Sequence, residues 1–152
     1  MSNLIRHKGI FRDRMDAPFV GTLISSIDCH HNCPGCFHQA MRDMPYEEDT
    51  VEDIIKEIKE DPFSEGVIFG GLEWTEQYGE LLELIHACLD ADLKVIVYTH
   101  HTEEEVYQRF SNLMDLPIYI KFGEYQEEHK VLNYTSHGVP LETSNQYIKY
   151  FG

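Results

Sequence analysis

The stretch that decides the fold is FVGTLISSIDCHHNCPGCFH, residues 19–38. Its first half, residues 19–27, is rich in β-branched and apolar side chains and predicts a strand that ends just before Cys29. Its second half places Cys29, Cys33 and Cys36 at the spacing C-x3-C-x2-C. Three thiolates can bind three irons of a cubic cluster and leave the fourth iron open, whereas clusters that only carry electrons are usually closed by four cysteines. The motif therefore predicts an iron–sulfur cluster that takes part in chemistry.

A zinc site is the alternative interpretation of this loop, with His30, His31 or His38 as the fourth ligand. Zinc favours closed tetrahedral sets of cysteine and histidine. Such sites usually combine short spacings from two separate loops, and here all three cysteines fall in one loop. We therefore favour iron–sulfur chemistry over zinc.

Strand-like and helix-like patterns alternate after the cysteine loop. Short apolar runs predict strands, and apolar residues at helical spacing predict helices between them. This alternation favours an α/β fold with a mostly parallel sheet and covering helices, in one domain that spans residues 1–152. The expected elements are a helix from Thr50 to about Pro62, a strand at 66–69, a helix at about 75–91, a strand at 93–99, a helix from Thr102 to about Leu113, a strand at 117–122 and a short last strand at 147–150.

Chemistry-bearing residues follow or close four of the predicted strands. Cys29, Gly70, Thr99 and Lys121 each lie at the carboxyl end of one of them. In α/β sheets of this kind, ligands bind beyond the carboxyl ends of the strands. We therefore expect these positions to meet at one edge of the sheet.

The composition excludes several classes of function. The formal net charge is −15, with 27 acidic and 12 basic residues, so no nucleic-acid partner is expected. A basic protein partner or simple solubility fits this charge. No apolar stretch is long enough to predict a membrane span, and the first residues do not resemble a signal peptide. A reducing cytoplasm is the expected location.

The motifs together resemble a known enzyme superfamily. The cysteine spacing after a first strand, followed by the Gly-Gly-x-Glu turn at residues 70–73, resembles the radical S-adenosylmethionine (SAM) superfamily. Within it, the segment 33–37 (CPGCF), Tyr98-Thr99 and the segment 141–146 (LETSNQ) are similar to the activating enzymes of anaerobic (class III) ribonucleotide reductases. The resemblance covers roughly residues 19–148.

This resemblance implies a fold and a reaction. The fold would be an incomplete (β/α) barrel with a curved, mostly parallel sheet and outer helices. Cys29, Cys33 and Cys36 would bind a [4Fe-4S] cluster, and SAM would chelate its open iron. Reductive cleavage of SAM would give a 5′-deoxyadenosyl radical, which would generate a glycyl radical on the large subunit of the reductase. A flavodoxin-like protein would donate the electron.

The resemblance also assigns residues to SAM binding: Phe37, Gly70, Gly71, Glu73, Thr99 and Lys121. Other interpretations of these positions stay open. The glycine pair could form a plain strand-to-helix turn, with Glu73 favouring the N-terminus of the next helix. Thr99 could face solvent at the start of a helix, and Lys121 could be a snorkelling lysine at a strand end. Asn145 and Gln146 could contact SAM or cap the sheet.

The remaining candidates have simpler expected roles. His30, His31, His100 and His101 could shuttle protons or bind metal, but we expect paired surface histidines. Cys88 is expected to be a small core residue and Trp74 to pack beside the glycine turn. The acidic runs at 46–49 and 102–105 are expected to favour helix N-termini. The rival functions are an activase of another glycyl-radical enzyme such as pyruvate formate-lyase, a small radical SAM enzyme acting on a nucleoside or peptide, and a non-enzymatic zinc-binding module.

Overall fold

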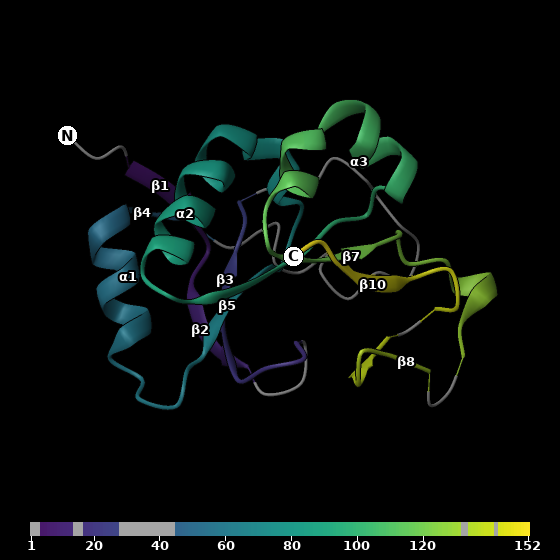
Figure 1. Cartoon of the computed structure of the whole chain (residues 1–152), viewed down its shortest axis with the longest axis horizontal. Coiled ribbons are helices and arrows are strands. Elements are labelled where there is room, and N and C mark those ends of the chain that lie inside the picture. Colours follow the sequence, from purple (N-terminus) through teal and green to yellow (C-terminus); the bar gives the residue numbers. More distant parts are fainter. Residues whose placement is uncertain (1–3, 14–16, 28–44, 132–133, 142) are drawn as a thin grey trace.

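The computed structural model describes residues 4–13, 17–27, 45–131, 134–141 and 143–152. Within these ranges the chain alternates between strands and helices, as Figure 1 shows. The strands are β1 (Leu4–His7), β2 (Ile10–Asp13), β3 (Gly21–Ser25), β4 (Glu47–Thr50), β5 (Gly66–Gly70), β6 (Lys94–Tyr98), β7 (Tyr119–Phe122), β8 (Thr135–Ser136), β9 (Val139–Pro140) and β10 (Tyr147–Tyr150). The α-helices are α1 (Val51–Lys59), α2 (Tyr78–Asp90) and α3 (Glu103–Arg109), and the short 3-10 helices are η2 (Trp74–Gln77), η3 (Ser111–Asp115) and η4 (Glu127–His129).

The main sheet in the described part of the chain has six strands in the order β10-β7-β6-β5-β3-β2. Its four central strands, β7, β6, β5 and β3, run parallel to one another. The outer strands β2 and β10 each pair antiparallel with their neighbours. The expected parallel arrangement is therefore confirmed for the centre of the sheet, and the fold is a mixed α/β fold.

The two faces of this sheet have different coverings. Val67, Phe69, Val95 and Val97 pack with α1, α2 and α3, which lie on one side of the sheet (Figure 1). Alternate residues point to the other face, because side chains alternate along a strand. There Ile68, Ile96 and Ile148 pack against Phe19, Val139 and Leu141. Burial on both faces explains why β5 and β6 are almost continuously apolar in sequence.

Two helices begin at the caps that the sequence predicts. Thr50 caps α1, with its hydroxyl oxygen 3.2 Å from the amide nitrogen of Asp53. Thr102 and Glu105 form a reciprocal capping box at the start of α3. Side-chain oxygens therefore satisfy amide groups that the first turn of a helix leaves without partners.

Two local features differ from expectation. The acidic run at 46–49 directly precedes the N-terminus of α1, as expected, but Glu47–Thr50 also forms strand β4, which pairs with β1. The helix expected at about 75–91 begins as η2 and becomes α2 only at Tyr78. Gln77 interrupts it, because its side-chain amide accepts from the Ile27 nitrogen (3.0 Å) and donates to the Arg6 carbonyl (2.8 Å). No helix in the described ranges combines the length and apolar composition needed to cross a membrane.

Candidate functional site

The carboxyl ends of the parallel strands form one edge, where the expected residues meet. The Ser26 amide donates to the Gly70 carbonyl (3.1 Å), and the Thr99 amide donates to the Lys121 carbonyl (3.0 Å). These bonds join the ends of β3 and β5 and the ends of β6 and β7, and β5 pairs with β6 between them. The predicted convergence of Gly70, Thr99 and Lys121 is therefore confirmed. Cys29, Cys33, Cys36 and Phe37, together with His30, His31 and His38, lie outside the described residues.

The Gly70-Gly71 turn depends on the absence of side chains. Gly71 has a φ of +84°, which L-residues with a side chain rarely adopt. A Cβ at Gly71 would lie 2.0 Å from the Ser25 Oγ and 3.0 Å from the Ser25 Cα. The turn thus lies directly against the end of β3, four residues before Cys29.

Replacing Gly71 with alanine should destabilise the chain by about 3 kcal/mol, because backbone strain and overpacking act together. Chemical denaturation of the cluster-free protein measures this change. Gly79→Ala is the matched control, since a Cβ there meets no atom within 4 Å and Gly79 lies in α2. Gly79→Ala should leave stability unchanged or raise it by up to about 1 kcal/mol. An equal response of the two variants would contradict this account of the turn.

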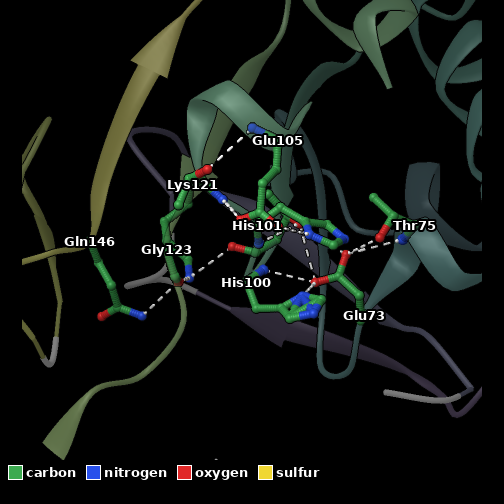
Figure 2. A network of polar contacts seen from close by, with 10 residues as sticks. Glu73, Thr75, His100, His101, Glu105, Lys121, Gly123 and Gln146 are labelled. Atoms are coloured by element: carbon green, nitrogen blue, oxygen red, sulfur yellow. Dashed lines mark hydrogen bonds and ion pairs between the residues drawn. The ribbon is translucent and has the colours of Figure 1, made fainter. Parts of the chain in front are cut away.

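Glu73 lies at the centre of a buried polar cluster that also contains Thr75, Thr99, His100 and His101, named here the Glu73 cluster (Figure 2). Its carboxylate accepts from the Thr75 hydroxyl (2.7 Å), the Thr99 hydroxyl (3.0 Å) and the His100 amide (2.7 Å). It also contacts the His100 ring through Nδ1 and accepts from the Thr75 amide (3.1 Å). The last bond confirms that Glu73 caps the following helix, η2.

This environment sets the charge of the carboxylate. Burial alone would raise the pKa of Glu73, but hydrogen bonds from His100 and Thr75 and the nearby charge of His100 outweigh it. They lower the pKa from 4.5 to about 2, so the carboxylate is ionised at neutral pH. Burial lowers the pKa of His101, and the charge of Glu73 opposes that shift.

The expectation that His100 and His101 are paired surface histidines was wrong. The side chain of His100 is only 10% exposed and that of His101 only 7%. Glu73 draws His100 inward because a buried carboxylate requires hydrogen-bond donors, and the His101 ring packs between those of His100 and Phe110. The sequence contained one usable signal, a histidine pair directly after a buried strand at the carboxyl edge.

Thr99 and Lys121 are also more buried than the simpler interpretations require. Thr99 is 1% exposed and donates to Glu73, so it does not face solvent. Lys121 is 7% exposed, and its ammonium group donates to the Gly123 carbonyl (2.8 Å) and lies 5.3 Å from the Tyr98 ring centre. Lys121 is therefore not a snorkelling lysine. Since Ile120 and Phe122 pack toward the helices, Lys121 lies on the opposite face of the sheet.

Three buried oxygens around this edge have no hydrogen-bond partner among the described residues. They are the Oγ of Ser26, the Oγ1 of Thr143 and the Oδ1 of Asn145. The Asn145 amide donates to the Glu124 carbonyl (2.9 Å) and the Gln146 amide to the Gly123 carbonyl (3.3 Å), which supports a capping role for this pair. Orphaned buried oxygens of this kind are expected where a polar ligand binds.

The structure confirms the core position expected for Cys88 and shows that Trp74, expected beside the turn, is buried as well. Cys88 is buried on α2, and burial raises the pKa of its thiol to about 12, so it is a poor nucleophile and ligand. Trp74 is buried, and its Nε1 donates to the Ile24 carbonyl on β3 (3.0 Å). Gln77, which sequence reasoning missed, joins β1 to the last described residue before the cysteine loop. No sequence pattern marks it.

Comparison with protein families gives a match over most of this architecture. The family model described as a 4Fe-4S single cluster domain matches residues 21–147. The chain belongs to the 4Fe-4S single cluster domain family. A search of the curated proteins found no match. The matched region begins at β3 and ends at β10, so it contains the cysteine motif and the whole carboxyl edge.

The donor set agrees with this 4Fe-4S family. Thiolates are the usual ligands of iron–sulfur clusters. Three of the four cysteines, all except Cys88, fall within eight residues of one another. The fourth cysteine, Cys88, is buried in the core away from any ligand role. Cys29, Cys33 and Cys36, which fall inside the matched region, remain the predicted ligands of the cluster.

Proposed function

We propose that this 4Fe-4S protein is a radical SAM enzyme that generates a glycyl radical on anaerobic ribonucleotide reductase. The observation that carries the proposal is the three-cysteine motif, which follows β3 in the sequence, together with the glycine turn after β5, which lies against Ser25 at the end of β3. Three protein ligands leave one iron for an exogenous ligand. The barrel would be incomplete, with the four parallel strands as its centre and α1, α2 and α3 outside.

The residues at the carboxyl edge suit a ligand of the SAM type. Gly70 is buried and carries no side chain, and a Cβ there would meet no atom closer than 3.4 Å, so the turn leaves space at this position. The orphaned Oγ of Ser26 and Oδ1 of Asn145 could take part in polar contacts. Lys121 supplies a buried positive charge for a carboxylate. Phe37 would complete the site from the cysteine loop.

Glu73 and Thr99 take a positioning role in this proposal. The Glu73 carboxylate already accepts hydrogen bonds from Thr75, Thr99 and His100. It therefore fixes the connections after β5 and β6 relative to each other. This rigidity would hold the glycine turn and Lys121 at fixed positions relative to the ligand.

When bound, the cluster and SAM would supply a 5′-deoxyadenosyl radical that abstracts hydrogen from a glycine of the partner. This chain's part would be to orient SAM and exclude water. The segment CPGCF at 33–37 and the Ser-Asn-Gln segment support the reductase as protein substrate, with a flavodoxin-like electron donor in the cytoplasm.

An anaerobic mixture of the reconstituted protein, SAM, a reductant and a class III reductase tests this function. Electron paramagnetic resonance should detect a glycyl radical on the reductase, and none when SAM is omitted. If the radical forms only on pyruvate formate-lyase, the proposed protein substrate is wrong, and the proposed radical chemistry is retained. Deoxyadenosine release with a nucleoside or peptide but no glycyl radical would indicate a small radical SAM enzyme. Stoichiometric zinc without iron uptake would refute the enzyme and indicate a zinc-binding module.

A further inference from the structure

Glu73, His100 and His101 bring three metal-ligating side chains together on two neighbouring connections. Glu73 follows β5, and the two histidines follow β6, the next strand in the sheet. One carboxylate oxygen and one ring nitrogen from each histidine lie within 4.8 Å of one another. Figure 2 shows the two rings close to the Glu73 carboxylate. All three residues lie far from the cysteines in the sequence and differ from them in donor chemistry.

We propose that Glu73, His100 and His101 bind a divalent transition metal of the zinc type, separately from the iron–sulfur cluster. One carboxylate and two imidazoles form a ligand set that zinc and iron(II) use, with further positions open to water. Magnesium and calcium prefer oxygen ligands alone and are disfavoured by the two imidazoles. Zinc therefore fits this donor set better than either.

The distances allow an ion after small side-chain movements. Zinc binds nitrogen and carboxylate oxygen at about 2.0–2.2 Å, so ligand atoms around one ion lie roughly 3.3 Å apart. The Glu73 oxygen and the His100 Nδ1 are now closer than that, and a proton must lie between these two acceptor atoms. An ion would take the place of this proton. The hydrogen bonds from the backbone amides of Thr75 and His100 to the same carboxylate would keep the connection after β5 in its present shape.

Surrounding groups orient the Glu73 carboxylate as outer partners of metal sites do. The Thr75 and Thr99 hydroxyls donate to the Glu73 carboxylate, at 2.7 Å and 3.0 Å. The Glu105 carboxylate lies 3.5 Å from the His101 Nδ1 and could serve as a further oxygen ligand. Hydrogen bonds of this kind fix ligand orientation and raise metal affinity. Residues outside the three proposed ligands therefore also contribute to the site.

A second candidate group provides an internal comparison. His7, Glu47 and Asp49 also present ligand atoms within 4.8 Å of one another. However, the His7 Nδ1 accepts from the Gly9 amide (3.1 Å) and its Nε2 contacts Asp49 (2.7 Å). Both carboxylates of that group are exposed to solvent. The pairing of β1 with β4 is enough to explain why these three residues lie together. We therefore place the metal at Glu73.

Cobalt(II) titration of a cysteine-substituted full-length chain tests the site. Replacing Cys29, Cys33 and Cys36 with serine removes the cluster, so the result does not depend on the proposed function. We expect one cobalt(II) per chain, with visible bands typical of nitrogen and oxygen ligands, displaced by added zinc. His100→Ala and His101→Ala should each lower cobalt affinity at least about 100-fold, and Thr99→Val about 10-fold, as an orienting residue would.

Two histidine variants serve as controls on the same background. His86→Ala, exposed on α2, should leave cobalt binding unchanged, and so should His7→Ala. Zinc should also raise the melting temperature of the parent chain but not that of His101→Ala, because binding to the folded state stabilises it. Thr99→Val retains all three ligands and gives a second measure if an alanine variant loses its native circular dichroism. Absence of stoichiometric cobalt binding, or loss of binding only in His7→Ala, would overturn the proposal.

Discussion

Replacing Cys36 with serine is expected to abolish iron binding and, with it, any SAM cleavage. A serine hydroxyl is a poor substitute for a thiolate, and two cysteines would then remain to bind a cluster that needs three. Iron should fall from about four atoms per chain to near zero after anaerobic reconstitution. Iron analysis and the visible absorption of the cluster measure the loss. Deoxyadenosine release should fall to background in the same sample.

Cys88→Ala is the matched control for this experiment. Cys88 is buried against α1 and the sheet as a small apolar residue, so its loss should cost about 1 kcal/mol of stability and no iron. The pair of variants separates ligand chemistry from a general effect of losing a cysteine. Iron retained in Cys36→Ser, or lost in Cys88→Ala, would contradict the assignment of the three loop cysteines as ligands.

Replacing Trp74 with alanine is expected to lower the free energy of unfolding by about 3–5 kcal/mol, because it leaves a large cavity in the core. The Trp74 side chain is 0% exposed and packs edge-on against Phe69, with ring centres 5.2 Å apart. The variant also loses the hydrogen bond to the Ile24 carbonyl. This is the only tryptophan of the chain, so urea denaturation should be followed by circular dichroism rather than by fluorescence.

Two further variants calibrate this loss. Trp74→Phe retains an aromatic ring but leaves the buried Ile24 carbonyl with one partner fewer, which should cost about 1–3 kcal/mol. Tyr107→Ala removes an aromatic side chain that is 69% exposed, and it should change stability by less than about 0.5 kcal/mol. If Trp74→Ala were as mild as Tyr107→Ala, the packing of Trp74 against Phe69 on β5 and its bond to Ile24 on β3 would not stabilise the core.

Trp74 also connects core stability to the site. It lies directly after Glu73 and donates to β3 two residues before Ser26. A cavity there should loosen both the Glu73 cluster and the strand that leads to the cysteine loop. We therefore expect Trp74→Ala to retain less iron than the parent chain at equal temperature.

The sequence predicted the central elements well because their signals are local. The apolar runs of β3, β5, β6 and β7 and the helical spacing in α1 each depend on neighbouring residues. The caps at Thr50 and Thr102 are likewise formed within three residues. The cysteine spacing is local too, and the family match over residues 21–147 agrees with it.

Strands β1, β2 and β4 were missed because their signals are not local. The sequence of β4, Glu47–Thr50, is entirely polar, and it becomes a strand only by pairing with β1, more than forty residues earlier. The His7 contact with Asp49 joins the same two strands. Such segments form strands because they pair with a partner strand, not because of their own β-propensity.

By itself, the sequence determined the α/β alternation, the carboxyl edge as the place of chemistry and the three thiolates that predict an iron–sulfur cluster. Only the tertiary structure decided the state of the polar residues at that edge. Glu73 and His100 are 27 positions apart, and they meet because β5 and β6 pair in the sheet. The free energy of burying a carboxylate without donors is high, so packing that buries Glu73 also brings the two histidines inward. No pattern along the chain contains that pairing.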